Sequence, residues 1–311
     1  MISIITPSLN QARFIETAIR SIAEQGSQTV EHLVIDGAST DGTVAILKKH
    51  PRLGWVSEPD QGPADALNKG FSKARGDILG WLNADDYYEP GALRAVERIF
   101  EKEPDTSVLI GRARVIDEEG KPLFLQEEPS AAGFTFEGML KYWKYDVLPQ
   151  PAIFFRRRVA DSLGPLDTGL CYFDYDYFLR MRQYFAFRRI PDVLVNIRFH
   201  PEAISVRDFF SGQRRKKLLA ASRRHWGRPA SFFYWKIAAS YYFHLPRSLW
   251  KSHYEKFALR HKGTLKKLFR ENPFLSFCWK ARGIILRHPF CATAAACGKL
   301  FRKNDGKNAN E

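Results

Sequence analysis

Short apolar runs alternate with helical patterns through the first hundred residues, and this alternation constrains the fold more than any other feature of the chain. The apolar runs lie at residues 2–5, 32–35, 54–56 and 78–82, where they predict buried strands. Between the runs, apolar residues recur at helical spacing, as at Ile15, Ile19 and Ile22. Strands and helices that alternate over short connections predict an α/β fold, in which a mainly parallel sheet is flanked by helices.

Polar segments follow three of the predicted strands at the point where each strand ends. They occupy residues 6–10, 36–42 and 83–86. Ligands of such sheets bind outside the carboxyl ends of the strands. We therefore expect the binding site at that edge of the sheet.

The segment Asn83-Ala84-Asp85-Asp86 places two adjacent carboxylates directly after the apolar run 78–82. Carboxylates at the end of a buried strand are costly unless a cation meets them there. Oxygen ligands of this kind suit a hard divalent ion that also reaches substrate phosphates. The alternative is a solvated turn, because Asn and Asp are common turn residues.

The charge of the chain is divided unevenly along its length. Residues 1–206 contain 24 Lys and Arg against 29 Asp and Glu, whereas residues 207–311 contain 24 against 5. Such a division indicates parts with different partners. We expect a domain at 1–206 that holds the chemistry, a basic, aromatic-rich helical extension at 207–303, and a disordered tail at 304–311.

The extension 207–303 mixes basic residues with Trp, Tyr and Phe. This mixture predicts helices that lie on an anionic membrane surface; the alternative is a set of helices packed on the domain with a solvated basic face. No stretch offers the roughly 20 uncharged apolar residues that span a bilayer. No recognised nucleic-acid module is visible, which argues against nucleic acid as the partner.

The N-terminus shows no secretory signal, because the first predicted strand begins at once. Together with the basic extension, this predicts a cytoplasmic protein held peripherally at the inner face of the cell membrane.

Five motifs lie in order along the first two thirds of the chain. They are Thr6-Pro7-Ser8-Leu9-Asn10, Asp36-Gly37-Ala38-Ser39-Thr40-Asp41-Gly42-Thr43, Asp65-Ala66-Leu67-Asn68-Lys69-Gly70, Asn83-Ala84-Asp85-Asp86 and Asp174-Tyr175-Asp176-Tyr177-Phe178-Leu179-Arg180. Together they resemble the family 2 glycosyltransferases over about residues 1–205. Each motif alone is weak, but five in sequence are specific. The resemblance implies a GT-A (Rossmann-like) fold and transfer of a sugar from a nucleotide-sugar.

The resemblance implies that the polar strand ends hold the donor. Asp36 can accept a hydrogen bond from an imino N–H of the base; the alternative is that Asp36 and Asp41 shape the turn and cap the next helix, a role we favour for Asp41. Asn68 either contacts the nucleotide or satisfies nearby loop carbonyls. The residues expected to contact the donor are Thr6, Pro7, Ser8, Asp36, Asp65, Asn68, Asn83, Ala84 and Asp85.

The resemblance also implies a Mg²⁺ or Mn²⁺ ion held by Asp85, with Asp86 in support, that bridges the two phosphates of the donor. The chain departs from the family's usual acidic triple at Asn83, which lowers the negative charge of the site. His200 lies where related enzymes often have a further metal ligand, and imidazole is an acceptable ligand for Mn²⁺. The alternative is an ordinary histidine at a strand end.

By resemblance, Asp174 is the expected general base. Single displacement with inversion needs a carboxylate that removes a proton from the acceptor hydroxyl as it attacks the anomeric carbon. Asp176 is the alternative base, or a partner of Arg180. The expected acceptor contacts are Trp81, Gln150 and Asp176, although a Trp in an apolar strand is more often part of a core.

These residues predict an inverting, metal-dependent hexosyltransferase that acts on a glycan or lipid-linked acceptor in polysaccharide or lipopolysaccharide synthesis. A UDP-sugar is the expected donor, by inference from Asp36. The alternative is a non-catalytic scaffold that binds a sugar nucleotide within a glycan assembly complex, and Asn83 is the one feature that favours it. The carboxylates Asp85, Asp86 and Asp174 favour the enzyme.

Overall fold

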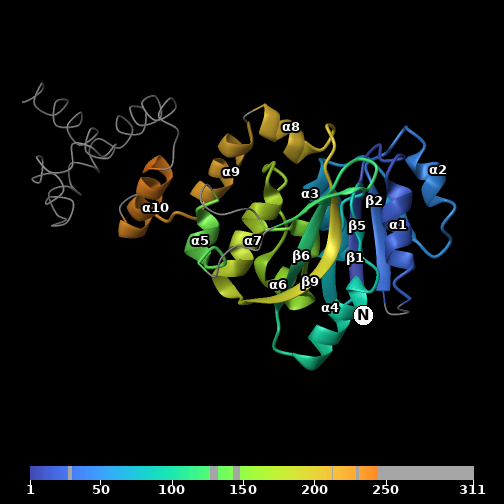
Figure 1. The fold of residues 1–311 in the computed structure, drawn as a ribbon, viewed down its shortest axis with the longest axis horizontal. Coiled ribbons are helices and arrows are strands. Elements are labelled where there is room, and N and C mark those ends of the chain that lie inside the picture. Colours follow the sequence, from blue (N-terminus) through green and yellow to red (C-terminus); the bar gives the residue numbers. More distant parts are fainter. Residues whose placement is uncertain (27–29, 127–131, 143–147, 212, 229–230, 244–311) are drawn as a thin grey trace, which may run out of the picture. The chain divides into compact units, whose positions relative to one another are not determined.

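The computed structural model describes residues 1–26, 30–126, 132–142, 148–211, 213–228 and 231–243. The chain divides into two compact units, Met1–His225 and Trp226–Glu311. The first unit contains a mixed sheet with helices on both of its faces (Figure 1). The predicted α/β class is confirmed.

One half of the sheet is parallel and carries the predicted strand ends. Its strands are β1 (Ile2–Ser8), β2 (Val30–Asp36), β3 (Gly54–Ser57) and β4 (Ile78–Trp81), in the spatial order β3-β2-β1-β4. Their register places Ser8, Asp36 and Ser57 side by side. The polar strand ends therefore meet at one edge, which we call the carboxyl edge.

The other half of the sheet mixes strand directions. Beyond β4 it continues through β8 (Ile153–Arg156), β6 (Val108–Ile116), β9 (Phe187–Arg198) and β5 (Tyr87–Tyr88), and β7 (Pro122–Leu125) pairs with β6. Strand β8 runs antiparallel to both β4 and β6, so β6 and its parallel neighbour β9 point the same way as β4. Strand β9 therefore also ends at the carboxyl edge, at Arg198.

The helices of the first unit follow the predicted strand–helix alternation as far as α4. They are α1 (Ile15–Ala23), α2 (Thr43–Leu47), α3 (Pro63–Lys73), α4 (Ala92–Lys102), α5 (Phe136–Leu140), α6 (Arg157–Leu163), α7 (Phe173–Tyr184), α8 (Ile204–Phe210) and α9 (Gln213–Arg223), and a 3-10 turn spans Gln150–Ala152. Helix α3 begins with a proline, which is pre-set for a first helical position. Gly70 then lets α3 approach β1 closely, because a Cβ there would collide with the side chain of Ile5.

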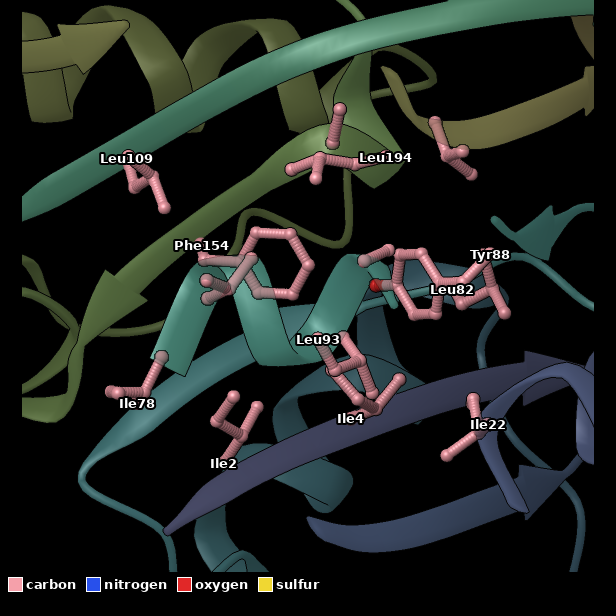
Figure 2. Close-up of a cluster of buried hydrophobic side chains, with 14 of the residues drawn as sticks. Ile2, Ile4, Ile22, Ile78, Leu82, Tyr88, Leu93, Leu109, Phe154 and Leu194 are labelled. Carbon is pink, nitrogen blue, oxygen red and sulfur yellow. The ribbon is translucent and has the colours of Figure 1, made fainter. Parts of the chain in front are cut away.

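The two faces of the sheet bury different clusters. On one face, Ile4 and Phe154 pack against Ile22 of α1 and Leu93 of α4 (Figure 2). On the other face, Trp81 packs against aromatic rings of α3, β8 and α7. Alternate residues of each strand supply the two clusters, as the period-2 geometry of a strand requires.

Helices α8 and α9 belong to the first unit, although the sequence assigned residues beyond 206 to a separate extension. Asp176 of α7 lies 2.8 Å from the ring of His225, and Asp167 lies 2.5 Å from Arg224. Ser222 donates a hydrogen bond to the carbonyl of Leu140. These contacts fix the segment to the α/β unit as far as His225.

The described part of the second unit contains α10 (Phe232–Phe243). Aromatic rings of this unit contact one another: the ring of Trp226, which precedes α10, lies against the rings of Tyr234 and Tyr241. In the described part of the chain, no helix has the length and apolar character needed to cross a membrane. Residues 244–303 of the predicted extension and the predicted tail 304–311 lie outside the described residues.

Candidate active site

Asp36 is fully buried at the end of β2, and hydroxyl and amide donors hold its carboxylate. Ser39 donates to it from the side-chain hydroxyl at 2.5 Å and from the backbone amide at 2.9 Å, and the Ser57 hydroxyl donates at 2.7 Å. These donors fix the orientation of the carboxylate before any ligand binds. The contact with a nucleotide base stays a prediction.

The end of β1 presents one polar side chain with free hydrogen-bonding capacity. The Ser8 hydroxyl is buried and makes no hydrogen bond with any described residue, whereas the Thr6 hydroxyl lies 2.9 Å from Nε2 of His32. Burial, together with a smaller effect of the nearby His50, lowers the pKa of His32 to about 3, so this imidazole is neutral at physiological pH. Ser8, next to the half-buried Pro7, is therefore the group at this strand end that is open to a ligand.

The loops after β1 and β2 are tied to each other. Asp41 accepts hydrogen bonds from the amides of Ala12 and Thr43, at 2.9 and 3.0 Å; it thereby joins the two loops and satisfies the first amide of α2, although the N-cap residue of that helix is Gly42. Asn10 and Ala38 both adopt left-handed backbone conformations, with φ values of 53° and 61°. Non-glycine residues rarely adopt such conformations, which often mark ligand-binding turns.

The two polar residues predicted on α3 have partners within the protein. The amide side chain of Asn68 donates to the carbonyl of Leu166 and accepts from its N–H, both at 2.9 Å. Of the two roles considered for Asn68, the structure thus favours the structural one, because Leu166 occupies both ends of the amide. Asp65 accepts from the amide of Gln61 and pairs with Lys69 at 3.3 Å.

The turn after β4 is organised by amide side chains. Asn83 donates to Asp86 and to the side-chain oxygen of Gln150, each at 3.0 Å, and Gln150 donates to the carbonyl of Trp81. Gln150 therefore holds the turn, and its predicted contact with an acceptor stays a prediction. Ala84 is buried in a hydrophobic cluster with Ile15 and Ile19 of α1, and its contact with the donor stays a prediction.

The two adjacent carboxylates of the turn have different roles. Asp86 is buried and accepts a hydrogen bond from the backbone amide of Arg198 at 2.9 Å, which fixes the turn to β9. Burial and the neighbouring charge of Asp85 raise the pKa of Asp86 well above its ordinary value. Asp85 instead points to His200, with Oδ2 lying 3.0 Å from Nε2, and its side chain is 20% exposed.

Asp85 and His200 are hydrogen-bonded to each other, and the 3.0 Å between Oδ2 and Nε2 also suits two ligand atoms of one divalent metal ion. Two neighbouring ligand atoms of an octahedral ion with bonds of about 2.1 Å lie about 3.0 Å apart. The Nδ1 atom of His200 is buried without a hydrogen-bond partner among the described residues, and the ring packs against Phe14 at 4.9 Å. Among the described residues, no group of three or more His, Cys, Asp or Glu side chains is placed to hold a metal. An ion at Asp85 and His200 would therefore need further ligands from substrate or water.

No role was predicted for Arg198 from the sequence, although it fixes this part of the site. It donates to the carbonyls of Asp85, Asp117 and Glu118, at 3.0, 3.3 and 2.5 Å. Its guanidinium also lies over the ring of Phe14. The one available signal was its place two residues before His200, since none of its carbonyl partners is near in sequence.

Arg198→Lys is expected to lower the free energy of unfolding by about 2 kcal/mol, because lysine cannot reach several carbonyls at once and leaves part-buried acceptors unpaired. Arg13→Lys is the matched control, since Arg13 pairs with Glu118 but is 56% exposed. Arg13→Lys should lower the free energy of unfolding by less than about 1 kcal/mol. Thermal denaturation of the two variants measures both, and equal losses would contradict the role given to Arg198.

Asp174 lies partly exposed in the first turn of α7. Burial raises its pKa to about 6, against the opposing effects of its hydrogen bond from the amide of Tyr175 and of the charge of Arg214. One helical turn further on, Phe178 stacks on Trp81 at 5.5 Å, which attaches this face of α7 to the end of β4. The carboxylate is thus placed on the helix face that meets the carboxyl edge.

Two of the residues predicted to contact an acceptor are packed inside the protein, and their contacts with an acceptor stay predictions. Trp81 is 1% exposed and lies among the rings of Phe71, Phe155 and Phe178, so its indole is part of the core. Asp176 is 3% exposed and paired with His225 and Arg180, at 2.8 and 3.2 Å. The ion pair with Arg180 matches the role of Arg180 partner that the sequence offered for Asp176 as the alternative to a base.

The strand order and the polar carboxyl edge define a GT-A glycosyltransferase fold. The Pyrobaculum calidifontis mannosyltransferase solved with GDP-Man and Mn²⁺ aligns with a TM-score of 0.57 and 19% identity, over 95% of this chain and 83% of that one. Staphylococcus aureus TarS 1-349, solved with UDP-GlcNAc, aligns with a TM-score of 0.52 and 19% identity, over 71% and 66%. At these identities the likeness shows the fold.

The chain belongs to glycosyl transferase family 2, whose profile matches residues 3–164. Among curated relatives, the Escherichia coli chondroitin synthase is 24% identical over 219 residues. The alignment covers 67% of this chain and 30% of the synthase, so the chain spans less than a third of that relative's length. The family predicted from the five motifs is confirmed.

Proposed function

We propose that the protein is an inverting, divalent-metal-dependent glycosyltransferase that moves a hexose from a nucleotide-sugar to a glycan or a lipid-linked acceptor. The observation that carries the proposal is the pair of Asp85 and His200 at the ends of β4 and β9, together with Asp174, whose pKa is raised and whose helix packs on the end of β4 through Phe178. The pair Asp85–His200 suits a divalent ion bound to the diphosphate of the leaving group. The carboxylate of Asp174 suits removal of a proton from the acceptor.

Asp85 and His200 would hold Mg²⁺ or Mn²⁺, and this ion would neutralise negative charge on the departing nucleoside diphosphate. Ser8 and the backbone around Ala38 and Ala84 face the donor in this proposal, and Asp36 accepts the imino N–H of the base. We propose a UDP-sugar as donor, which TarS binds. The GDP-Man bound by the mannosyltransferase makes a guanine nucleotide the rival outcome.

In this proposal Asp174 acts as the general base. It removes the proton of one acceptor hydroxyl as that oxygen attacks the anomeric carbon, and the bond from this carbon to the diphosphate oxygen breaks. A single displacement of this kind inverts the anomeric configuration. The pKa of about 6 keeps the carboxylate ionised at neutral pH while leaving it more basic than an ordinary Asp.

The chondroitin synthase relative supports a place in polysaccharide synthesis, and lipopolysaccharide is an alternative product. We further propose that the protein acts at the cytoplasmic face of a membrane, to which the basic residues 207–303 attach it. Flotation with anionic vesicles tests the attachment, and a protein that stays at the bottom of the gradient would contradict it.

The experiment for the proposed function incubates the full chain with a panel of nucleotide-sugars, Mn²⁺ and saccharide acceptors, and follows release of nucleoside diphosphate. Proton NMR of the product then gives its anomeric configuration. Steady release with an inverted product is the expected result. Binding of a nucleotide-sugar with no turnover would instead indicate the scaffold, and retention would contradict the single displacement.

The pH profile of transfer should reflect Asp174. Only the ionised carboxylate accepts a proton, so log kcat/KM is expected to rise with unit slope below about pH 6 and to level off above it. The groups that lower the pKa of this carboxyl against the effect of burial are the backbone amides of Tyr175 and Asp174 and the charge of Arg214 on α9. Initial rates between pH 4.5 and 8.5 test this, and an inflection below about pH 4.5 would contradict the raised pKa.

A further inference from the structure

The start of α7 carries polar groups that the proposed chemistry leaves unused. Helix α9 packs against α7, and α8 packs against α9 (Figure 1). Tyr172, just before α7, and Arg214 of α9 are electrostatic neighbours, and Arg214 acts in the same way on Asp174. A cation and a phenol therefore lie within electrostatic range of the candidate base.

The cationic side chains on this face of α9 have different partners. Lys217 is bound by both carboxylate oxygens of Asp208, at 2.7 and 2.9 Å. Arg214 lies three residues earlier and so on the same helix face. It makes no hydrogen bond or ion pair with the rest of the described chain, and it is half-buried. Its charge remains available to a ligand.

Tyr172 offers a second unsatisfied group at the same place. Its hydroxyl is buried and has no hydrogen-bond partner within the described ranges. Burial and the charge of Asp208 raise the pKa of this phenol, so the hydroxyl stays protonated and can donate. A buried hydroxyl without a partner usually indicates a missing ligand or water.

We propose that the acceptor carries an anionic group, a carboxylate or a phosphate, close to its reacting hydroxyl, and that Arg214 binds this group with help from the Tyr172 hydroxyl. The proposal rests on the proposed function and names the acceptor class for the same site. Guanidinium matches both anions with paired hydrogen bonds. It also offsets the repulsion that an anionic acceptor meets from the carboxylate of Asp174. Arg214 is therefore a specificity-determining residue.

The test measures binding of three sugars that differ at one position: D-glucuronate, D-glucose 6-phosphate and D-glucose. Calorimetry uses the full chain saturated with Mn²⁺ and the tightest-binding nucleoside diphosphate, so that the donor site is filled. The wild type is expected to bind a charged sugar at least about 10-fold more tightly than D-glucose. The tighter of the two charged sugars identifies carboxylate or phosphate as the anion.

Arg214→Gln should remove this preference, whereas Lys216→Gln, which removes the same charge from an exposed position of α9, should keep it. Tyr172→Phe should weaken binding of the charged sugar by about 3-fold and leave binding of D-glucose unchanged. The proposal would be overturned if the wild type bound D-glucuronate, D-glucose 6-phosphate and D-glucose equally, or bound none of them. It would also be overturned if Arg214→Gln and Lys216→Gln lost the preference for the charged sugar equally. Failure to bind any nucleotide would contradict the proposed function instead.

Discussion

Asp174→Asn is expected to reduce sugar transfer by about 10³-fold and to leave nucleotide-sugar binding nearly unchanged. General bases contribute about 10² to 10⁴-fold to such reactions, and the amide is similar in shape but cannot accept the proton. The variant should also lose the rise in rate near pH 6, because the group with the raised pKa is gone. Initial rates and calorimetric donor binding, measured on the same preparation, separate the two effects.

A neighbouring aspartate provides the control. Asp161→Asn changes an exposed carboxylate of α6 and should leave transfer within about 2-fold of the wild type. Asp176→Asn should instead lower the free energy of unfolding, because it breaks the pairs with His225 and Arg180. Normal turnover by Asp174→Asn would refute the assignment of the base.

The second large effect is expected for Asp85→Asn, which should weaken Mn²⁺-dependent nucleotide binding by about 100-fold. The substitution removes the one carboxylate charge directed at His200, and hard divalent ions depend on charged oxygen ligands. Calorimetric titration with nucleoside diphosphate, with and without Mn²⁺, measures the loss.

Asp86→Asn is the matched comparison, because the two carboxylates are adjacent. The side-chain oxygen of the asparagine can still accept the hydrogen bond from the backbone N–H of Arg198. We therefore expect a change in thermal stability but a smaller loss of metal-dependent binding than for Asp85→Asn. If Asp86→Asn lost metal binding while Asp85→Asn kept it, the roles given to the two residues would be reversed.

The parallel half of the sheet and its polar edge could be predicted because periodicity is a local property. Each run, such as residues 2–5 or 78–82, carries its own pattern of burial, and parallel strands necessarily end at a common edge. The mixed half could not be predicted in the same way. Its order depends on pairings such as β8 between β4 and β6, which no local pattern specifies.

The functions of single polar side chains depended on partners distant in sequence. Asn68 pairs with Leu166, and Asp176 with His225, so motif position alone could not show that both are occupied. The boundary at residue 206 followed a change in composition. It differs from the end of the compact unit at His225, because the contacts of Arg224 and His225 with Asp167 and Asp176 are not visible in the charge balance of the sequence.

The most direct test of the account is whether nucleotide binding depends on a divalent ion at Asp85. Nucleoside diphosphates and their sugar derivatives are titrated into the full chain by calorimetry, with Mn²⁺ or with a chelator. The account predicts tight binding of at least one nucleotide with Mn²⁺ and a loss of about 10-fold or more with the chelator. A protein that binds no nucleotide-sugar with either Mn²⁺ or Mg²⁺ would contradict it.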